Sequence, residues 1–286
     1  MNFRAGFPEG AFIALLIGGS KVERILRDDR VRAATLTGSE HAGASVASIC
    51  GEEIKPTVLE LGGSDPFIIM PSADIEKAVK VGTTARTQNN GQSCIAAKRF
   101  FVHADIYDDL KERFIKAFES LKIGDPMNDD TDIGPLVNKD AVVTITKQVE
   151  NAIKDGAKCV IGAEPIKGEG FYFKPGIIEG IPKSSNAYHE EIFGPVMLLF
   201  KVTSLDEALE IANASPFGLG SSVWTTDKDE QEKAIKQIEA GATFINSMTA
   251  SDPRLPFGGV KRSGYGRELA AEGIHAFCNV KTVSIA

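Results

Sequence analysis

The chain has 286 residues, of which 43% are hydrophobic and 25% are charged. This composition is typical of a globular protein with one large domain or two. A formal net charge of -7 and the lack of a long lysine and arginine block argue against nucleic-acid and acidic-membrane partners. No segment reaches the roughly 18 to 20 uninterrupted apolar residues that a membrane helix needs. Small-molecule chemistry is the better expectation.

The first part of the chain predicts one strand-helix-strand unit and a further strand. The apolar run AFIALLIGG at 11–19 is interpreted as a buried strand, and Ser20 after it can cap a short helix. VRAATLTG at 31–38 and TVLELGG at 57–63 are the next expected strands. This order is typical of a βαβ unit.

The rest of the chain continues to alternate strands with helices, which predicts an α/β protein with a largely parallel sheet. A turn-rich loop is expected at 123–136. Further strands are expected at 65–70, 98–103, 158–162 and 196–202, and helices at 73–86, 106–122 and 138–156, before a helix-strand-helix run to about residue 246.

The four cysteines and four histidines are scattered along the chain and form no CxxC or other zinc-ligand spacing. We therefore expect no metal site. Without a secretory segment or paired cysteines, the cytoplasm is the expected compartment. Cys50, Cys159 and Cys278 are expected to be packing residues, the last in a C-terminal helix.

Cys94 is different, because in NNGQSCIAAKR at 89–99 it follows a glycine turn. We interpret CIAAKR as the first turn of a short helix, whose N–H groups would favour a thiolate. Gly91 would let the backbone approach a ligand. On this stretch alone, a buried cysteine that only fills space is the more frequent case.

Glu60 is the candidate general base, since it ends an apolar strand and two glycines follow it. A partly desolvated carboxylate has a raised pKa and can accept a proton near neutral pH. The alternative is a strand-end residue that faces solvent. A cysteine hydrolase would need a histidine base, and none of the four histidines lies in a motif that recommends it.

Seven segments, in order, resemble those of the NAD(P)-dependent aldehyde dehydrogenases. They are TGSEHAG at 37–43, LELGGSDPF at 59–67, NNGQSCIAAKR at 89–99, EEIFGPV at 190–196, PFGLGSSVWT at 216–225, FIN at 244–246 and PFGGVKRSGYGRE at 256–268. The amino-acid sequence of these segments is most similar to that of the short prokaryotic succinate-semialdehyde dehydrogenases of that family. The resemblance implies the aldehyde dehydrogenase fold, an NAD or NADP cofactor and a small-molecule aldehyde substrate.

The resemblance also implies roles for individual residues. Cys94 would attack the aldehyde, and Glu60 would activate the water that hydrolyses the resulting thioester. The remaining family positions would bind the cofactor: Gly38 and Ser39 its pyrophosphate, Glu191 the nicotinamide ribose and Phe193 the nicotinamide side. Taken alone, the first pair is a capping TGS turn and Glu191 belongs to a solvated acidic pair.

The expected architecture is a partial Rossmann-like cofactor domain and a complete catalytic α/β domain. Residues 1–62 would be the second half of the cofactor domain, 63–262 the catalytic domain, and 263–286 a C-terminal helix and oligomerisation strand. That strand, NVKTVSI, would join a partner's sheet in a homodimer or homotetramer.

Two segments of the family are not in this chain: a Trp-Asn segment that supplies an oxyanion donor and a lysine that binds the adenosine ribose. Met1 is thus interpreted as an internal methionine, a misplaced start or the start of a truncated product. The alternative to an enzyme is therefore a catalytically inactive fragment that acts as an assembly or binding module.

The substrate site is the least defined part of this prediction. A carboxylate-tailed aldehyde needs a cation, best an arginine that grips both oxygens. Arg86 could point into the substrate channel from the end of its helix, or could instead stabilise the helix C-terminus. The loop NSMTASDPR at 246–254 is the other candidate wall, with Ser247, Ser251 and Arg254 as donors.

Overall fold

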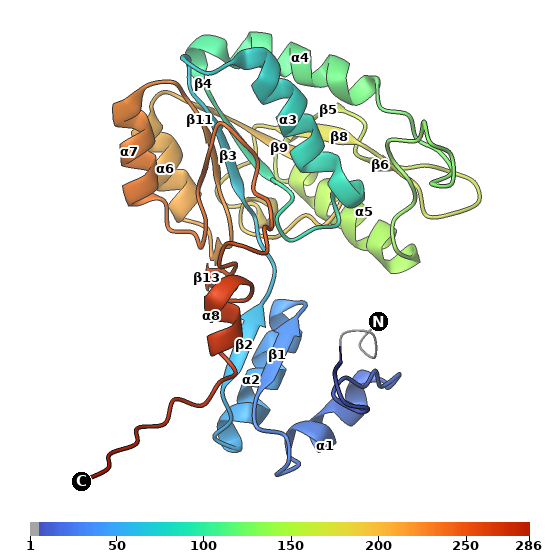
Figure 1. The fold of residues 1–286 in the computed structure, drawn as a ribbon. Coiled ribbons are helices and arrows are strands. Elements are labelled where there is room, and N and C mark those ends of the chain that lie inside the picture. The colour runs from blue at the N-terminus through green and yellow to red at the C-terminus, as the bar shows by residue number, and fades with distance from the viewer. Residues whose placement is uncertain (1–5) are drawn as a thin grey trace.

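The computed structural model describes residues 6–286, and it contains a large α/β unit above a smaller one (Figure 1). The smaller unit holds α1 (Val22–Leu26), β1 (Ala34–Thr37), α2 (Glu40–Glu52) and β2 (Thr57–Glu60). β1 and β2 are parallel, and β14 (Gly264–Tyr265) pairs with β2 in the antiparallel direction. The division into domains at 62 and 262 stays a prediction.

The large unit is built on a seven-stranded sheet with the order β12-β11-β3-β4-β9-β8-β5. Every neighbouring pair in this sheet is parallel except β8 and β5. The predicted α/β class with a largely parallel sheet is therefore confirmed. The strands are β3 (Pro66–Ile69), β4 (Arg99–His103), β5 (Lys158–Ile161), β8 (Gly176–Glu179), β9 (Val196–Val202), β11 (Ser222–Trp224) and β12 (Phe244–Ile245).

The remaining elements lie outside this sheet, and their short strands form two separate two-stranded sheets. The helices are α3 (Ile75–Thr87), α4 (Tyr107–Glu119), α5 (Lys139–Lys154), α6 (Leu205–Asn213), α7 (Lys228–Gln237) and α8 (Ala270–His275). The short strands are β6 (Glu164–Pro165), β7 (Phe173–Lys174), β10 (Phe217–Gly218) and β13 (Val260–Lys261). Among the helices of residues 6–286, none is both long and apolar enough to span a bilayer.

Side-chain alternation along the central strands buries apolar side chains on both faces of the sheet. Phe67 of β3 and Phe100 of β4 stack at 4.8 Å between ring centroids and pack with residues of α3 and α4. The next residues, Ile68 and Phe101, face the other side and pack with residues of α6 and α7. Successive side chains of a strand point to opposite faces, so both faces of these strands are buried.

The apolar run at 11–19 is not a strand, and this prediction was wrong. Its side chains are exposed: Leu16 is at 102% and Phe12 at 76% of full exposure. An apolar run becomes a buried strand only beside a neighbouring strand, and no described residue pairs with it. Ser20 lies inside a 3₁₀ turn at Gly19–Lys21 and does not cap α1, so that expectation was also wrong.

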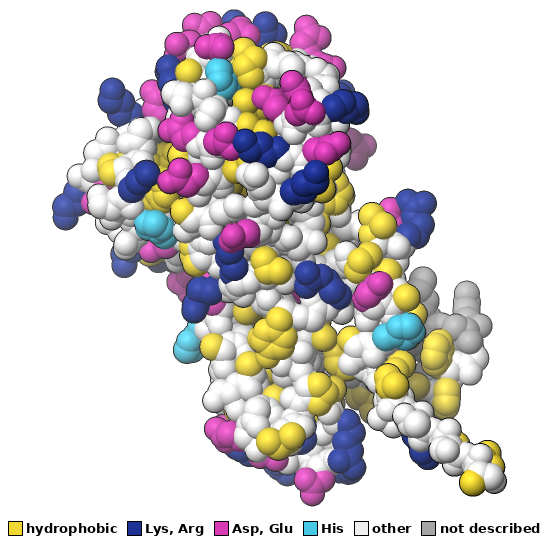
Figure 2. Space-filling view, turned by 90° about the vertical axis from the view of Figure 1, so that its left-hand side faces the viewer, with side chains coloured by type: hydrophobic (Ala, Val, Ile, Leu, Met, Phe, Trp, Pro, Cys, Tyr) yellow, Lys and Arg dark blue, Asp and Glu magenta, His cyan; other side chains and the backbone are white. Residues whose placement is uncertain are grey.

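The C-terminal segment also differs from the prediction. Cys278 lies beyond the end of α8 rather than inside a helix. Residues 279–286 run away from both units as a single extended segment without a paired strand (Figure 1). Apolar side chains on this tail, such as Val280 and Ile285, are more than 90% exposed. The space-filling view shows apolar side chains, in yellow, on a segment that projects at lower right (Figure 2). Its pairing with a partner stays a prediction.

Candidate active site

The loop that carries Cys94 begins with an unusual backbone. Asn89, Asn90 and Gly91 all have positive φ, at 50°, 57° and 73°, in the left-handed region that L residues seldom adopt. The side chain of Asn90 fixes the loop, because its Nδ2 donates to Pro135 O at 2.9 Å and its Oδ1 accepts from Gly134 N–H at 2.9 Å. A Cβ atom at position 91 would collide with Gly194, so Gly91 provides a close approach between two loops.

Cys94 itself lies in a turn between the 3₁₀ helix η3 (Gln88–Gly91) and β4, so the expectation of a helix from Cys94 onward was wrong. The turn closes when Ala96 N–H donates to Ser93 O at 3.1 Å, and Ala97 N–H then donates to Ala85 O of α3. The chain then continues directly into β4 of the sheet. The side chain of Cys94 is partly buried, and it is not disulfide-bonded.

A buried lysine supports the main chain at this turn. Lys98 is wholly buried, and its Nζ donates to the carbonyl oxygens of Ser93 and Cys94 at 2.7 Å each. The same ammonium forms an ion pair with Oε1 of Glu191 at 3.1 Å. Sequence reasoning did not find Lys98. The signal was a lysine within the expected strand at 98–103, because a lysine that becomes buried with such a strand needs an anion or carbonyl partners.

Glu191 connects the nucleophile loop to the end of β2. Its Oε1 also accepts the N–H of Gly63 at 3.1 Å. A Cβ atom at Gly62 would collide with its Oε2, so the chain passes close to this oxygen. Among the described residues, no hydrogen bond reaches Oε2. The interpretation of Glu191 as one of a solvated acidic pair is therefore wrong, since this carboxylate is largely buried and ion-paired.

Glu60 is buried, at 3% exposure, and neither carboxylate oxygen has a hydrogen-bond partner among the described residues. Burial, followed by the nearby Glu268, raises its pKa to about 8 against the opposing effect of Arg267. Glu60 therefore does not face solvent. A carboxyl group with such a pKa exchanges a proton near neutral pH, which is a property of a general base. Its action as a base stays a prediction.

Glu268 and Arg267 were missed as neighbours of Glu60, because they lie more than 200 residues further along the chain. The antiparallel pairing of β14 with β2 places Gly264 opposite Glu60. The following residues then return beside this carboxylate, and a Cβ atom at Gly258 would lie 2.7 Å from Glu60 Oε1. The GYGRE residues contributed to the resemblance to the family. Their location beside β2 is known only from the pairing of β14 with β2.

The TGS turn lies at the amino end of α2. Ser39 caps this helix, since its Oγ accepts Ala42 N–H at 3.3 Å, and Gly38 N–H donates to Glu60 O at 3.0 Å. Gly38 and Ser39 are exposed. The capping role is therefore confirmed, and the pyrophosphate role is a separate prediction that requires this exposed helix start.

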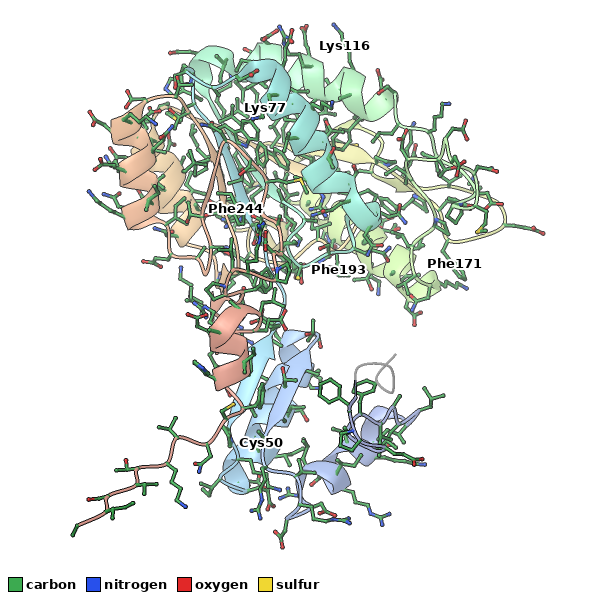
Figure 3. All side chains as sticks on the ribbon, in the orientation of Figure 1. Cys50, Lys77, Lys116, Phe171, Phe193 and Phe244 are labelled. Atoms are coloured by element: carbon green, nitrogen blue, oxygen red, sulfur yellow. The ribbon has the colours of Figure 1, made fainter. Side chains whose placement is uncertain are left out.

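Phe193 is 42% exposed at the edge of the large unit that faces the smaller one (Figure 3). The Lys98 Nζ lies 5.9 Å from its ring centroid. Cys50, by contrast, lies within the smaller unit on α2, where it is buried. The exposed ring thus remains available for a flat ligand group.

The expected substrate residues do not converge. Arg86 is wholly buried and its Nη2 donates to Gly91 O at 2.8 Å, so its expected orientation into an open channel is wrong. Ser247 and Ser251 are exposed. Arg254 is exposed and paired with Asp252 at 2.6 Å. A role for any of them in binding a substrate stays a prediction.

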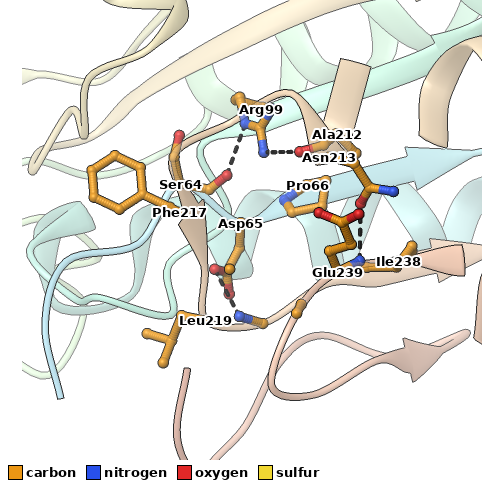
Figure 4. Close-up of a pocket in the computed structure, with 13 residues that line it drawn as sticks. Ser64, Asp65, Pro66, Arg99, Ala212, Asn213, Phe217, Leu219, Ile238 and Glu239 are labelled. Atoms are coloured by element: carbon orange, nitrogen blue, oxygen red, sulfur yellow. Dashed lines mark hydrogen bonds between the residues drawn. The ribbon is translucent and has the colours of Figure 1, made fainter. Parts of the chain in front are cut away.

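A small cavity lies behind the site and is too small for a substrate. Its volume is about 10 Å³, and it is lined in part by Ser64, Asp65 and Arg99 (Figure 4). Arg99 Nε donates to Ser64 O at 2.8 Å, and Gly220 N–H donates to Asp65 Oδ1 at 3.0 Å. Burial raises the pKa of Asp65 to about 6, which Lys98 opposes. These hydrogen bonds connect the segment that follows Gly63 to β4 and to the loop at Gly220.

Known proteins match this chain over nearly its whole length. The aldehyde dehydrogenase family model matches residues 2–283. A succinate-semialdehyde dehydrogenase [NADP(+)] of Mycobacterium avium is 59% identical over 282 residues, which are 99% of this chain and 60% of that protein. Succinate-semialdehyde dehydrogenase [NADP(+)] 1 of Mycobacterium tuberculosis is 58% identical over 283 residues, 99% of this chain and 62% of that protein.

Among solved structures, a succinic semialdehyde dehydrogenase of Streptococcus pyogenes in complex with NADP+ superposes with a TM-score of 0.96 at 41% identity. The match covers 99% of this chain and 62% of that one. The chain therefore spans about three fifths of the length of the relatives it matches. The sequence, the fold and the structural match agree, and the chain belongs to the aldehyde dehydrogenase family.

Proposed function

We propose that this chain carries the catalytic part of an NADP+-dependent dehydrogenase that oxidises succinate semialdehyde to the acid. The observation that carries the proposal is the cluster formed by Cys94, Lys98 and Glu191, in which a partly buried thiol lies on a turn tied to a carboxylate with one unbonded oxygen. The names of the relatives support the substrate and the cofactor.

The residues present fit such a cofactor. Oε2 of Glu191 lies beside Gly62, and only a residue without a side chain leaves this oxygen accessible. It would accept a hydrogen bond from a ribose hydroxyl. The exposed ring of Phe193 would pack against the nicotinamide, and the exposed start of α2 at Gly38 and Ser39 would face the pyrophosphate. When bound, the cofactor would accept a hydride.

Cys94 would supply the nucleophile. Its thiolate would add to the aldehyde carbon to form a thiohemiacetal, and loss of hydride from that carbon would leave a thioester on the sulfur. The N–H of Cys94, which has no partner among the described residues, would donate to the oxyanion. Covalent catalysis of this kind divides one difficult oxidation into two easier steps.

Glu60 would act in the second step. Its carboxylate would take a proton from a water molecule, whose oxygen attacks the thioester and releases the acid and the Cys94 thiol. Because burial raises the pKa of Glu60 to about 8, the group can accept a proton from water and return it near neutral pH. Its position near Gly258 and away from solvent favours this role over a surface one.

A chimaera provides the test, in which the part of the Mycobacterium avium enzyme outside the match is joined to this chain. We expect NADPH formation with succinate semialdehyde in the wild-type chimaera and none when Cys94 is replaced by alanine. The matched control is Cys159→Ala, which changes an exposed cysteine of β5 and should leave the rate unchanged. Equal rates in all three proteins would exclude the proposal.

The second candidate is an assembly or binding module without turnover of its own. The exposed apolar side chains of Phe12, Ile13, Leu15 and Leu16 favour it, because such a patch is typical of a surface that another segment covers. Purified as 286 residues, the chain would then form no NADPH. Turnover of succinate semialdehyde by this chain alone would exclude the second candidate and support the first.

A further inference from the structure

Lys98 is the only lysine with a wholly buried side chain in the described part of the molecule. Burying an ammonium group is costly unless each N–H has a partner. Lys98 has three such partners, the carbonyl oxygens of Ser93 and Cys94 and Oε1 of Glu191. All three belong to the candidate active site, so the cost of burying Lys98 is offset there.

The two carbonyl bonds determine where the neighbouring N–H groups point. In a planar trans peptide, the C=O of one residue and the N–H of the next point in opposite directions. When Lys98 holds Ser93 O on its side, the Cys94 N–H is directed away from the ammonium. Likewise, when Lys98 holds Cys94 O, the Ile95 N–H is directed away.

The surroundings of the Cys94 and Ile95 N–H groups are consistent with these directions. Burial raises the pKa of the Cys94 thiol, and the Ile95 N–H opposes that rise as a backbone donor. The Cys94 N–H makes no hydrogen bond to any described residue, which leaves it available to an oxyanion. Donors that are held in place before the reaction stabilise developing charge more than donors that must reorient.

Several charged groups act on the Cys94 thiol. Burial raises its pKa, Lys98 lowers it, and Asp65 and Glu191 raise it. Lys98 in turn faces Glu191, Asp65 and Arg86, and burial lowers its own pKa while Glu191 opposes that shift. The ion pair at 3.1 Å keeps the ammonium charged, because a neutral amine would leave Glu191 without its counterion.

We propose that Lys98 is a positioning residue, which directs the Cys94 and Ile95 N–H groups toward the oxyanion and the sulfur and places a fixed positive charge behind the nucleophile. The proposal rests on the proposed function, in which Cys94 is the nucleophile. It also links the nucleophile to Glu191, because one ammonium holds both the Cys94 turn and the carboxylate that would bind the ribose.

Thiol alkylation tests this without turnover, so a chain that forms no NADPH can still be measured. Iodoacetamide would be reacted with the 286-residue chain across a pH series, and modification of the Cys94 peptide would be followed by mass spectrometry. In Lys98→Met, which has a similar shape but no charge, we expect the midpoint of the pH profile to rise by about one unit or more. At neutral pH the alkylation rate would fall several-fold.

Two further variants guard against a general loss of structure. Lys98→Gln keeps donors for the carbonyls without the charge, and its midpoint should rise as in Lys98→Met. Lys111→Met is the matched control, because Lys111 also pairs with a glutamate, Glu179 at 3.2 Å, but lies on α4. Its midpoint should equal that of the wild type.

Circular dichroism would establish which variants are folded. A raised midpoint in a folded Lys98 variant, with no change in Lys111→Met, supports the proposal whether or not the dehydrogenase assay succeeds. Unchanged midpoints in the folded Lys98 variants would overturn it. In that case Lys98 would only fill space in the interior and neutralise the charge of Glu191. The proposed function would still be tested by the NADPH assay of the chimaera.

Discussion

The ammonium of Lys98 lies 2.7 Å from the carbonyl oxygen of Cys94, so the candidate nucleophile is held through its main chain by a side chain four residues further along. This bond fixes the turn on the side opposite to the N–H groups of Cys94 and Ile95. It explains how a turn, rather than the expected helix, can present Cys94 in a defined orientation.

Replacement of Cys94 by alanine should abolish NADPH formation in the chimaera, because no other cysteine lies on this turn. Cys50 is buried in α2, and Cys159 and Cys278 are exposed elsewhere. Alanine at any of these three positions should leave kcat within about twofold of wild type, since none takes part in the chemistry. Steady-state absorbance of NADPH measures this, and appreciable turnover by Cys94→Ala would contradict the assignment.

The Glu60→Gln variant should form one equivalent of NADPH in a burst and then nearly stop, because glutamine cannot take a proton from water. In the wild type, hydrolysis requires the deprotonated carboxylate, so the steady-state rate should rise as pH increases through about 8. Stopped-flow absorbance separates the burst from the steady state. A wild-type steady-state rate in the variant would remove Glu60 from this role.

The same carboxyl group should affect stability in a pH-dependent way. Its pKa is about 8 in the folded chain against 4.5 for the free group, so between these values the folded state binds more protons than the unfolded state. The free energy of unfolding contributed by Glu60 therefore falls as pH rises, by up to about 5 kcal/mol. Glu60→Gln should raise Tm near the upper end of this range and change it little near the lower end. An equal change at both ends would show that Glu60 is not desolvated.

Arg86→Ala tests whether this arginine holds the turn or the substrate. Because Arg86 is wholly buried and donates to Gly91 O at 2.8 Å, we expect similar losses of kcat/KM for succinate semialdehyde and for butanal. The loss should be at least about tenfold, as is common when a nucleophile is displaced. A rise in KM confined to succinate semialdehyde would instead assign Arg86 to the substrate carboxylate.

The helices and the central strands of the large unit could be predicted from the sequence, since their side-chain patterns act locally. Leu110, Phe114 and Phe118 of α4 are buried as the helical period requires. The run at 11–17 could not be assigned in the same way, because its apolar pattern does not say whether a neighbouring strand is present.

The candidate site was predictable only in part for a similar reason. Cys94 and Glu60 have local signals, a glycine turn and a strand end. Glu268 and Arg267 act through contacts that the sheet creates, and no spacing in the sequence shows that they return beside Glu60. Lys98 contacts nearby carbonyl oxygens, but its ion pair with Glu191 joins residues that are distant in the sequence.

Mass spectrometry of the trapped intermediate tests the central claim most directly. The Glu60→Gln chimaera would be mixed with NADP+ and succinate semialdehyde, quenched in acid and digested. We predict a succinyl thioester on the peptide that contains Cys94, in an amount equal to the NADPH burst, and no adduct when NADP+ is omitted. Formation of NADPH without an adduct on Cys94, or with the adduct on another cysteine, would contradict the account.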